Sequence, residues 1–396
     1  MGAQLFWKKK IVFCGIETIY KTDPVLTGAL NGIEVRNMSL TPLKLKKVEQ
    51  NIEQSYLGQM RELVVGQEVQ LKFDVAIAGS GTPGVRPAWG VLMRMCKRSE
   101  TVLAAAVVGT ATAGSASSLT LAVGASAVDD AYRCFEITAT GGTGAGQTAI
   151  IASYVGATKV ATFFEPVAIP FDVTTVYAVD AQVVYAPVDT GDDSGTFYAF
   201  LDSLKFIILG ARGDVDRTLD PLKVPVFTFT FTGLWGGYSD QVSMPAGTVF
   251  SAWKIPQAVN AVNTTGFSLH GFAANMYSYN VKDGNQVVHR DDMVGVEDVV
   301  ITDRKPTGTV VIQMPLKAEH DYYADAIGSG NNNQPVEGSM MLTHGTGAGN
   351  MVRFYEPAVT VSDPTPSDKN GTIALSMALR INPVGNGRND SIIIVD

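Results

Sequence analysis

Charged side chains are scarce in this chain, and positive ones are the scarcer. Asp, Glu, Lys and Arg make up 17% of the 396 residues, against 46% hydrophobic residues, and 30 Lys and Arg stand against 38 Asp and Glu. A surface that grips nucleic acid needs clustered Lys and Arg, so a net charge of −8 argues against one. A weakly charged, strand-rich surface also leaves sheet edges and apolar patches that assembly would cover.

Cysteine and long apolar runs are also lacking. The cysteines Cys14, Cys96 and Cys134 are odd in number and far apart, which excludes a readable disulfide framework or metal-ligand spacing. We expect reduced, inert thiols in a cytoplasm, where the protein is made and folded. No run of about 18 apolar residues occurs, so we expect no membrane-spanning helix.

Signatures of enzymes are missing too. The segment Gly141–Thr148 comes close to a phosphate-binding loop, but Gln147 stands where the lysine must be, and a hairpin turn is the better interpretation. No G-x-S-x-G motif is present, and His320-Asp321 is interpreted as helix surface polarity. We therefore predict no enzyme, no catalytic residue, no cofactor and no metal. No H-x-x-x-H pair occurs among the histidines His270, His289, His320 and His344.

The sequence is rich in alternation. Over Val69–Ile77, large apolar residues alternate with more polar ones, which is the period of a half-buried strand. The segments Phe227–Phe231 and Ile373–Ile381 repeat this period. Together with frequent Val and Thr and 40 Gly, these patterns predict a mainly β fold.

Only two short helices are predicted. The second is expected over residues 315–327 and ends at Gly328-Ser329-Gly330, because glycine is typical of a helix end. The first follows Pro87, which suits a first helical turn. Its apolar stripe consists of Trp89, Leu92, Met93 and Cys96.

The two helices lie at equivalent places in a repeated order of elements. Each follows a strand, a charged segment and a second strand, and each precedes a strand, a turn rich in Asp and Pro, and a final strand. The charged segments span residues 44–62 and 282–305, and the turns are Asp220-Pro221 and Asp363-Pro364-Thr365-Pro366. We interpret this order as an internal duplication.

The first unit is interrupted by residues 104–179, which are poor in charge and rich in Ala, Gly, Thr and Val. Short strand patterns there predict a small inserted β domain. The predicted division is a first domain over 1–103 plus 180–240, the insert over 104–179, and a second domain over 241–396. Each of the two tandem domains is expected to be a β-sandwich or barrel with one short helix.

The charged segments 44–62 and 282–305 are the most informative polar features. They are interpreted either as solvated long loops or as arms that become ordered only against a neighbouring ring, their mixed charges setting the register between subunits. The residues predicted to make contacts between subunits or rings are Lys44, Lys46, Lys47, Glu49, Glu53, Tyr56, Arg61, Arg290, Asp291, Asp292, Arg304 and Lys305.

Four segments carry a resemblance to a known family. They are Gly15–Pro24 (GIETIYKTDP), Ala78–Thr82 (AGSGT) leading to Pro87–Gly90 (PAWG), Asn263–Ser268 (NTTGFS) and Ile301–Gly308 (ITDRKPTG). Taken in this order, they resemble the tail tube, or major tail, proteins of long-tailed bacteriophages. The resemblance covers nearly the whole chain outside the insert.

The resemblance implies a tail-tube fold, a β-sandwich or barrel flanked by a helix with a long loop or hairpin. Copies of this fold join their inner sheets into one β-lined pore. With two such domains per chain, it implies a homotrimeric ring with pseudo-sixfold symmetry, whose head-to-tail contacts cover every sheet edge. The insert is expected to face outward as a decoration. The chain is then a structural protein of the virion, stacked in rings as the conduit for DNA ejection.

The implied partners are a tail terminator, baseplate or distal tail proteins, and a tape measure protein in the lumen. Viral double-stranded DNA would pass without specific binding, since an acidic or neutral wall does not hold phosphate. The protein would be made in the bacterial host's cytoplasm and end in the virion tail. An alternative from another class is a receptor-binding spike or glycan-binding adhesion protein, favoured by the Gly- and Thr-rich insert. A second alternative is a β-rich hydrolase. It would need paired carboxylates in a cleft, a geometry that the sequence neither shows nor excludes.

Overall fold

The computed structural model describes residues 4–191, 193–241, 243–328, 334–385 and 387–396. Within these ranges the protein is mainly β, as the alternating patterns predicted, and none of the helices there is long and apolar enough to cross a membrane. The helices in these ranges are α1 (Gly28–Asn31), α2 (Gly90–Met95) and α3 (Tyr322–Ile327).

The second predicted helix is much shorter than expected. α3 begins at Tyr322 instead of near Pro315, because Asp321 caps it by accepting a hydrogen bond from the Ala324 N–H at 3.1 Å. The helix ends before Gly328, as predicted, whereas Ser329 and Gly330 lie outside the described residues.

One group of strands, here called the first set, pairs antiparallel in the order β2-β1-β14-β15-β16-β4-β3. Its members are β1 (Lys10–Ile16), β2 (Gly32–Ile33), β3 (Arg36–Glu49), β4 (Glu62–Ala76), β14 (Gly195–Leu201), β15 (Leu204–Leu219) and β16 (Val226–Asp240).

The second set pairs antiparallel in the order β18-β17-β23-β24-β25-β22-β19. Its members are β17 (Thr264–Leu269), β18 (Phe272–Ala273), β19 (Met276–Lys282), β22 (Thr307–Gln313), β23 (Gly338–His344), β24 (Val352–Lys369) and β25 (Thr372–Asn382).

One connection joins the sets, and a further run of strands extends the second set. The end of β15, Asp216–Leu219, pairs with Tyr279–Lys282 of β19. The further run pairs β5 with β13, β13 with β26, and β26 with β24 of the second set. These three strands are β5 (Thr101–Leu103), β13 (Gln182–Tyr185) and β26 (Ile392–Val395).

The alternating apolar residues form the main core. In β4, Val69, Leu71, Phe73 and Val75 are fully buried, as the period of this segment predicted. The Phe73 ring stacks on Phe231 of the adjacent β16 with the ring centres 5.9 Å apart. Fully burying a side chain of this size stabilises a fold by roughly 1.5–3 kcal/mol. One large core therefore spans both sets of strands.

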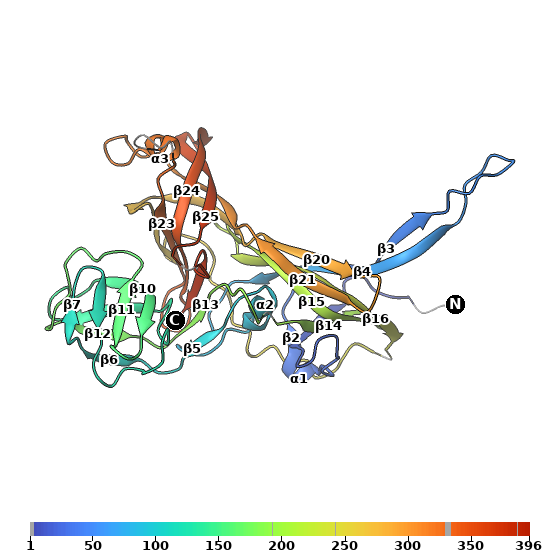
Figure 1. Cartoon of the computed structure of the whole chain (residues 1–396), viewed down its shortest axis with the longest axis horizontal. Coiled ribbons are helices and arrows are strands. Elements are labelled where there is room, and N and C mark those ends of the chain that lie inside the picture. Colours follow the sequence, from blue (N-terminus) through green and yellow to red (C-terminus); the bar gives the residue numbers. More distant parts are fainter. Residues whose placement is uncertain (1–3, 192, 242, 329–333, 386) are drawn as a thin grey trace.

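Residues 107–179 form a separate seven-stranded sheet with the order β6-β12-β9-β10-β11-β8-β7. It has its own apolar cluster, which extends onto Tyr355 of β24 and onto Ile392 and Ile394 of β26. Figure 1 shows this sheet at the opposite end of the molecule from the β3–β4 hairpin. Its strands are β6 (Val107–Thr110), β7 (Ala113–Gly114), β8 (Ser118–Thr120), β9 (Glu136–Gly141), β10 (Thr148–Val155), β11 (Val160–Phe163) and β12 (Val176–Val179).

The turn predicted at Asp363-Pro364-Thr365-Pro366 is wrong. These residues lie inside β24, where an irregularity in register interrupts the pairing with β25 between Ser362 and Thr365. The chain reverses instead at Asn370 and Gly371, whose φ angles of 54° and 80° suit a tight hairpin turn. Proline is tolerated in β24 because this strand segment lies at a sheet edge, where a missing N–H leaves no ladder partner unsatisfied.

A fully buried ionic network holds the two sets together where they meet. Arg98, which follows α2, forms a bidentate pair with Asp283 at 2.6 and 2.7 Å. Arg217 of β15 lies 2.8 Å from Glu356 of β24. Both guanidinium groups also donate to the hydroxyl oxygen of Ser391, at 3.2 and 2.6 Å. The two arginines thus bind carboxylates that belong to the other set or directly follow it.

The charges of this network are coupled. Burial alone would raise the pKa of Asp283, but the guanidinium groups of Arg98 and Arg217 hold it below its usual value. Burial keeps the pKa of Glu356 raised despite its contact with Arg217. Removing one member of a buried ion pair leaves the other charge without compensation.

We predict that Asp283→Asn lowers the free energy of unfolding by about 3–5 kcal/mol, because Arg98 loses its counter-charge in a buried site. Urea-induced unfolding followed by tryptophan fluorescence measures this loss. The matched control is Asp220→Asn, whose partner Lys223 is 3.0 Å away on the surface, and it should change stability by at most about 1 kcal/mol. Equal effects of the two substitutions would contradict the prediction.

Asp214 of β15 adds a pH dependence. Burial and the nearby charge of Asp283 raise its pKa to about 7, whereas an aspartate in an unfolded chain has a pKa of about 3.9. Between these values the folded protein holds a proton that the unfolded chain has released, so stability falls as pH rises through this window. We predict that the stability of Asp214→Asn relative to the parent increases when the pH is raised from 5 to 8, because only the parent loses stability by this titration. Urea unfolding of both proteins at both pH values measures the difference. If the difference in free energy of unfolding between the two proteins is the same at both pH values, Asp214 is not the group responsible.

Candidate functional site

The outer part of the β3–β4 hairpin, residues 43–68, is an arm that projects from the body of the molecule (Figure 1). Residues 43–49 of β3 and 62–65 of β4 are exposed on both sides of the hairpin. This part of the chain was expected to be either a loop or an arm, and the structure makes it two paired strands with a connection at residues 50–61.

Cross-strand ion pairs fix the register of the arm. Lys44 pairs with Glu68 at 2.5 Å, and Lys47 pairs with Glu62 at 2.6 Å. Lys46 donates to His289 on the neighbouring hairpin at 3.2 Å. The predicted lysines are therefore placed on the arm, but each already has a partner within the chain.

Large apolar side chains are exposed along the arm. An isolated two-stranded hairpin is marginally stable in water, and one with apolar groups on both faces gains little from burying either. Exposed apolar surface of this extent marks an interaction site. These side chains are Leu43, Leu45, Val48, Ile52, Tyr56, Leu57, Leu63, Val64 and Val65.

The second charged segment is a hairpin that lies back on the body, consisting of β20 (Asn285–Asp291) and β21 (Glu297–Arg304). Arg212 of β15 donates to the Val299 carbonyl, and Asn285 donates to the Cys96 carbonyl at 2.9 Å. It is therefore a docked hairpin, neither a free loop nor a projecting arm.

The remaining predicted contact residues differ in exposure. Arg290 lies on the surface in a bidentate pair with Asp298 at 2.7 and 3.0 Å, and it also meets Asp292 at 3.7 Å. Arg304 is mostly buried and pairs with Asp390 inside the chain. Its placement gives a neighbouring subunit little to touch. All the other residues of the predicted set are exposed: Lys44, Lys46, Lys47, Glu49, Glu53, Tyr56, Arg61, Asp291, Asp292 and Lys305.

Two strand edges complete the candidate surface. Among the described residues, β3 pairs only with β4, and the outer part of β24, residues 365–369, pairs only with β25. In the two pairing orders, β15 has the same place as β24, and β19 has the same place as β3. The edges of β15 and β19 are joined within the chain. There, Asn280 donates its side-chain N–H to the Thr218 hydroxyl at 2.8 Å.

The free edge of β24 carries devices that limit unspecific pairing. Pro364 and Pro366 lack an N–H, and Asp363 and Asp368 add negative charge. Prolines and charges are typical means by which proteins protect a sheet edge. An edge protected in this way discriminates between partners by charge and shape.

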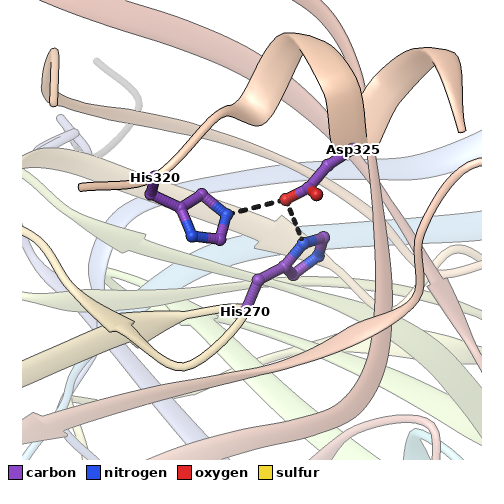
Figure 2. Close-up of side chains that lie close together, drawn as sticks. All are labelled: His270, His320 and Asp325. Atoms are coloured by element: carbon purple, nitrogen blue, oxygen red, sulfur yellow. Dashed lines mark hydrogen bonds and ion pairs between the residues drawn. The ribbon is translucent and has the colours of Figure 1, made fainter. Parts of the chain in front are cut away.

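A histidine cluster lies beside α3 (Figure 2), and α3 lies far from the arm (Figure 1). His270 follows β17, His320 precedes α3, and Asp325 lies in the helix. The carboxylate oxygen Oδ2 of Asp325 is 2.9 Å from His270 Nδ1 and 2.7 Å from His320 Nε2. His320 was interpreted as surface polarity beside Asp321, but its contact is with Asp325 and its side chain is mostly buried. No spacing rule links His270 to this pair, because the sheet brings it there.

The other candidate motifs are structural. The glycine-rich segment Gly141–Thr148 connects β9 and β10 as a turn. All three cysteines are buried and free, and burial raises the pKa of Cys134 to about 12, which keeps its thiol protonated and unreactive.

Comparisons with known proteins give no further guide to function. No protein-family model matches the chain, and no curated protein matches it significantly.

Proposed function

We propose that this protein is a structural subunit of a bacteriophage tail tube, which closes head-to-tail with two further copies into a ring and stacks in rings. The first support is the repeated pairing order. Replacing β2, β1, β14, β15, β16, β4 and β3 by β18, β17, β23, β24, β25, β22 and β19 reproduces every neighbour relation of the first set. This order is what two tandem tube domains over 1–103 plus 180–240 and over 241–396 would have.

The observation that carries the proposal is the joined edge inside the chain. The β15 edge of the first domain continues into β19 of the second. The second domain presents the equivalent edge on β24, and the first domain presents the counterpart of β19 on β3. A second copy of the chain placed by the same relation pairs its β3 with this β24. Repetition of one head-to-tail contact closes a ring when the rotation per copy divides the circle.

The register of the joined edge gives the contact between copies. Thr218 and Asn280 face each other within the chain. Ser367 takes the place of Thr218, because it pairs with Ala374 of β25 as Thr218 pairs with Val226 of β16. Ser39 takes the place of Asn280 by its pairing with Lys72 of β4. Ser39 and Ser367 are both exposed, and we place them opposite each other in adjacent copies.

The arm then connects rings. Its exposed apolar side chains lie beyond the sheet that forms the ring, where a neighbouring ring covers them. The inserted sheet of residues 107–179 lies at the opposite end of the molecule from the arm, and we place it on the outside of the tube. The chain's net charge of −8 suits a lumen that does not hold DNA during ejection. The tail terminator, distal tail and tape measure proteins are the partners of such a tube.

We predict that the double variant Ser39→Cys, Ser367→Cys forms disulfides between copies under mild oxidation. Non-reducing gel electrophoresis should show a ladder that ends at the covalent trimer, since closure leaves no free edge. The native cysteines are buried, so their background should be low.

Either single variant alone serves as the control, and it should give no ladder beyond a dimer. Monomer in the double variant under conditions where negative-stain microscopy shows rings would refute the proposed register. Compact monomers at all concentrations, together with saturable glycan binding, would replace the tube by an adhesion protein.

We predict that the arm variant Val48→Thr, Leu63→Thr, Val65→Thr abolishes stacking into tubes but leaves the folded ring, because it removes apolar surface and keeps strand-forming residues. Electron microscopy and sedimentation separate rings from tubes. The matched control, Val108→Thr, Val155→Thr, Val176→Thr, removes comparably exposed residues from strands of the inserted sheet. Tubes of normal length from the arm variant would show that the arm does not connect rings.

A further inference from the structure

We propose that His270, His320 and Asp325 bind a divalent transition-metal ion of the zinc class. This site is independent of the assembly function proposed above. The three ligand atoms, two imidazole nitrogens and one carboxylate oxygen, lie within 4.8 Å of one another, and both imidazole rings face the Asp325 carboxylate (Figure 2). Two histidines and a carboxylate, with water as a fourth ligand, are a ligand set that Zn²⁺ accepts.

The hydrogen bonds of His270 argue for a cation at this point. Its Nε2 lies 2.9 Å from the Val359 carbonyl oxygen, which can only accept, so Nε2 carries the proton. In the neutral ring the other nitrogen, Nδ1, then presents a lone pair. This lone pair faces the Asp325 carboxylate oxygen at 2.9 Å, so two acceptors oppose each other. A metal ion bound by both satisfies them, and the bond to Val359 orients the ring as in many metal sites.

In the first set, Glu17 occupies the place that corresponds to His270, and its surroundings differ. Glu17 follows β1, and its backbone N–H donates to the Ser194 carbonyl. In the same way, His270 follows β17, and its backbone N–H donates to the Ser339 carbonyl. The carboxylate of Glu17 accepts hydrogen bonds from the hydroxyls of Ser194 and Thr196 at 2.7 and 2.8 Å. Glu17 is thus satisfied by donors, whereas His270 meets another acceptor.

The surroundings hold the ligands and leave a route to them. The His320 ring lies 4.3 Å from the Tyr322 ring and stacks on Phe272 at 5.7 Å, centre to centre. It also lines a surface pocket of about 510 Å³ beside α3. In a tetrahedral zinc site the ligand atoms lie about 3.3 Å apart, so Asp325, now 2.7 and 2.9 Å from the two nitrogens, must draw back and the two rings must adjust around the ion. The metal would then fasten α3 to the sheet through the turn after β17.

The test uses the tag-free full chain, treated with EDTA and dialysed. Isothermal titration with Zn²⁺ should show one tight site per chain, and Co²⁺ should give the intense visible absorption of tetrahedral coordination. His320→Gln and Asp325→Asn should each weaken binding at least tenfold. The control is His344→Gln, whose ring hydrogen-bonds the Thr264 hydroxyl and the Gln257 carbonyl at 3.0 and 3.1 Å, and it should bind metal as the parent does.

A second measurement needs no variant. Of the four histidines, only the rings of His270 and His320 should shift in long-range ¹H–¹⁵N spectra when Zn²⁺ is added. The proposal is overturned if the parent shows no saturable site, if His344→Gln loses binding as His320→Gln does, or if other histidine rings shift instead. In the first case Asp325 serves only as the hydrogen-bond partner of the two rings.

Discussion

The arginine–carboxylate network between the two sets of strands is the constraint on which the rest of the molecule depends. Arg98, which follows α2, and Arg217 of β15 find their carboxylates in Asp283, which follows β19, and Glu356 of β24, and all four side chains are fully buried. An apolar contact at this place would tolerate sliding, whereas a bidentate guanidinium pair fixes both distance and direction. The joined edge of β15 and β19 lies directly beside this network, so the angle between the sets is fixed where it would set the curvature of a ring.

Much of the fold could be predicted from the sequence, and the failures have physical causes. The alternation in β4, β16 and β25 predicted strands because each has one face in the core. The Asp363–Pro366 turn was wrong because proline is compatible with an edge strand as well as with a turn, and only the partner strand decides between them. The charged segments were not recognised as hairpins. Cross-strand pairs such as Lys44–Glu68 depend on the register of the two strands, and composition does not contain that register. The histidine cluster was missed because the sheet brings His270 to Asp325 across 55 residues of sequence.

The two sets share one pairing order yet use it differently. In the first set the hairpin is continuous with the sheet and extends beyond it, whereas in the second it becomes the separate pair β20–β21, docked on β15. Glu17 and His270 show the same divergence at a single position, one satisfied by hydroxyls and the other by a carboxylate. A duplicated unit that keeps its strand order while changing its hairpins would give alternate positions around a ring different tasks.

The exposed arm has a consequence for how a polymer of this protein would grow. A two-stranded hairpin with uncovered apolar groups is costly to hold in order on a lone subunit, and that cost disappears when a neighbour covers it. Starting a new filament requires several such hairpins to be ordered at once, whereas extending an existing end requires covering only those of the incoming ring. Growth would then show a lag and a critical concentration, and a preformed end would act as the seed that determines where and when polymerisation begins.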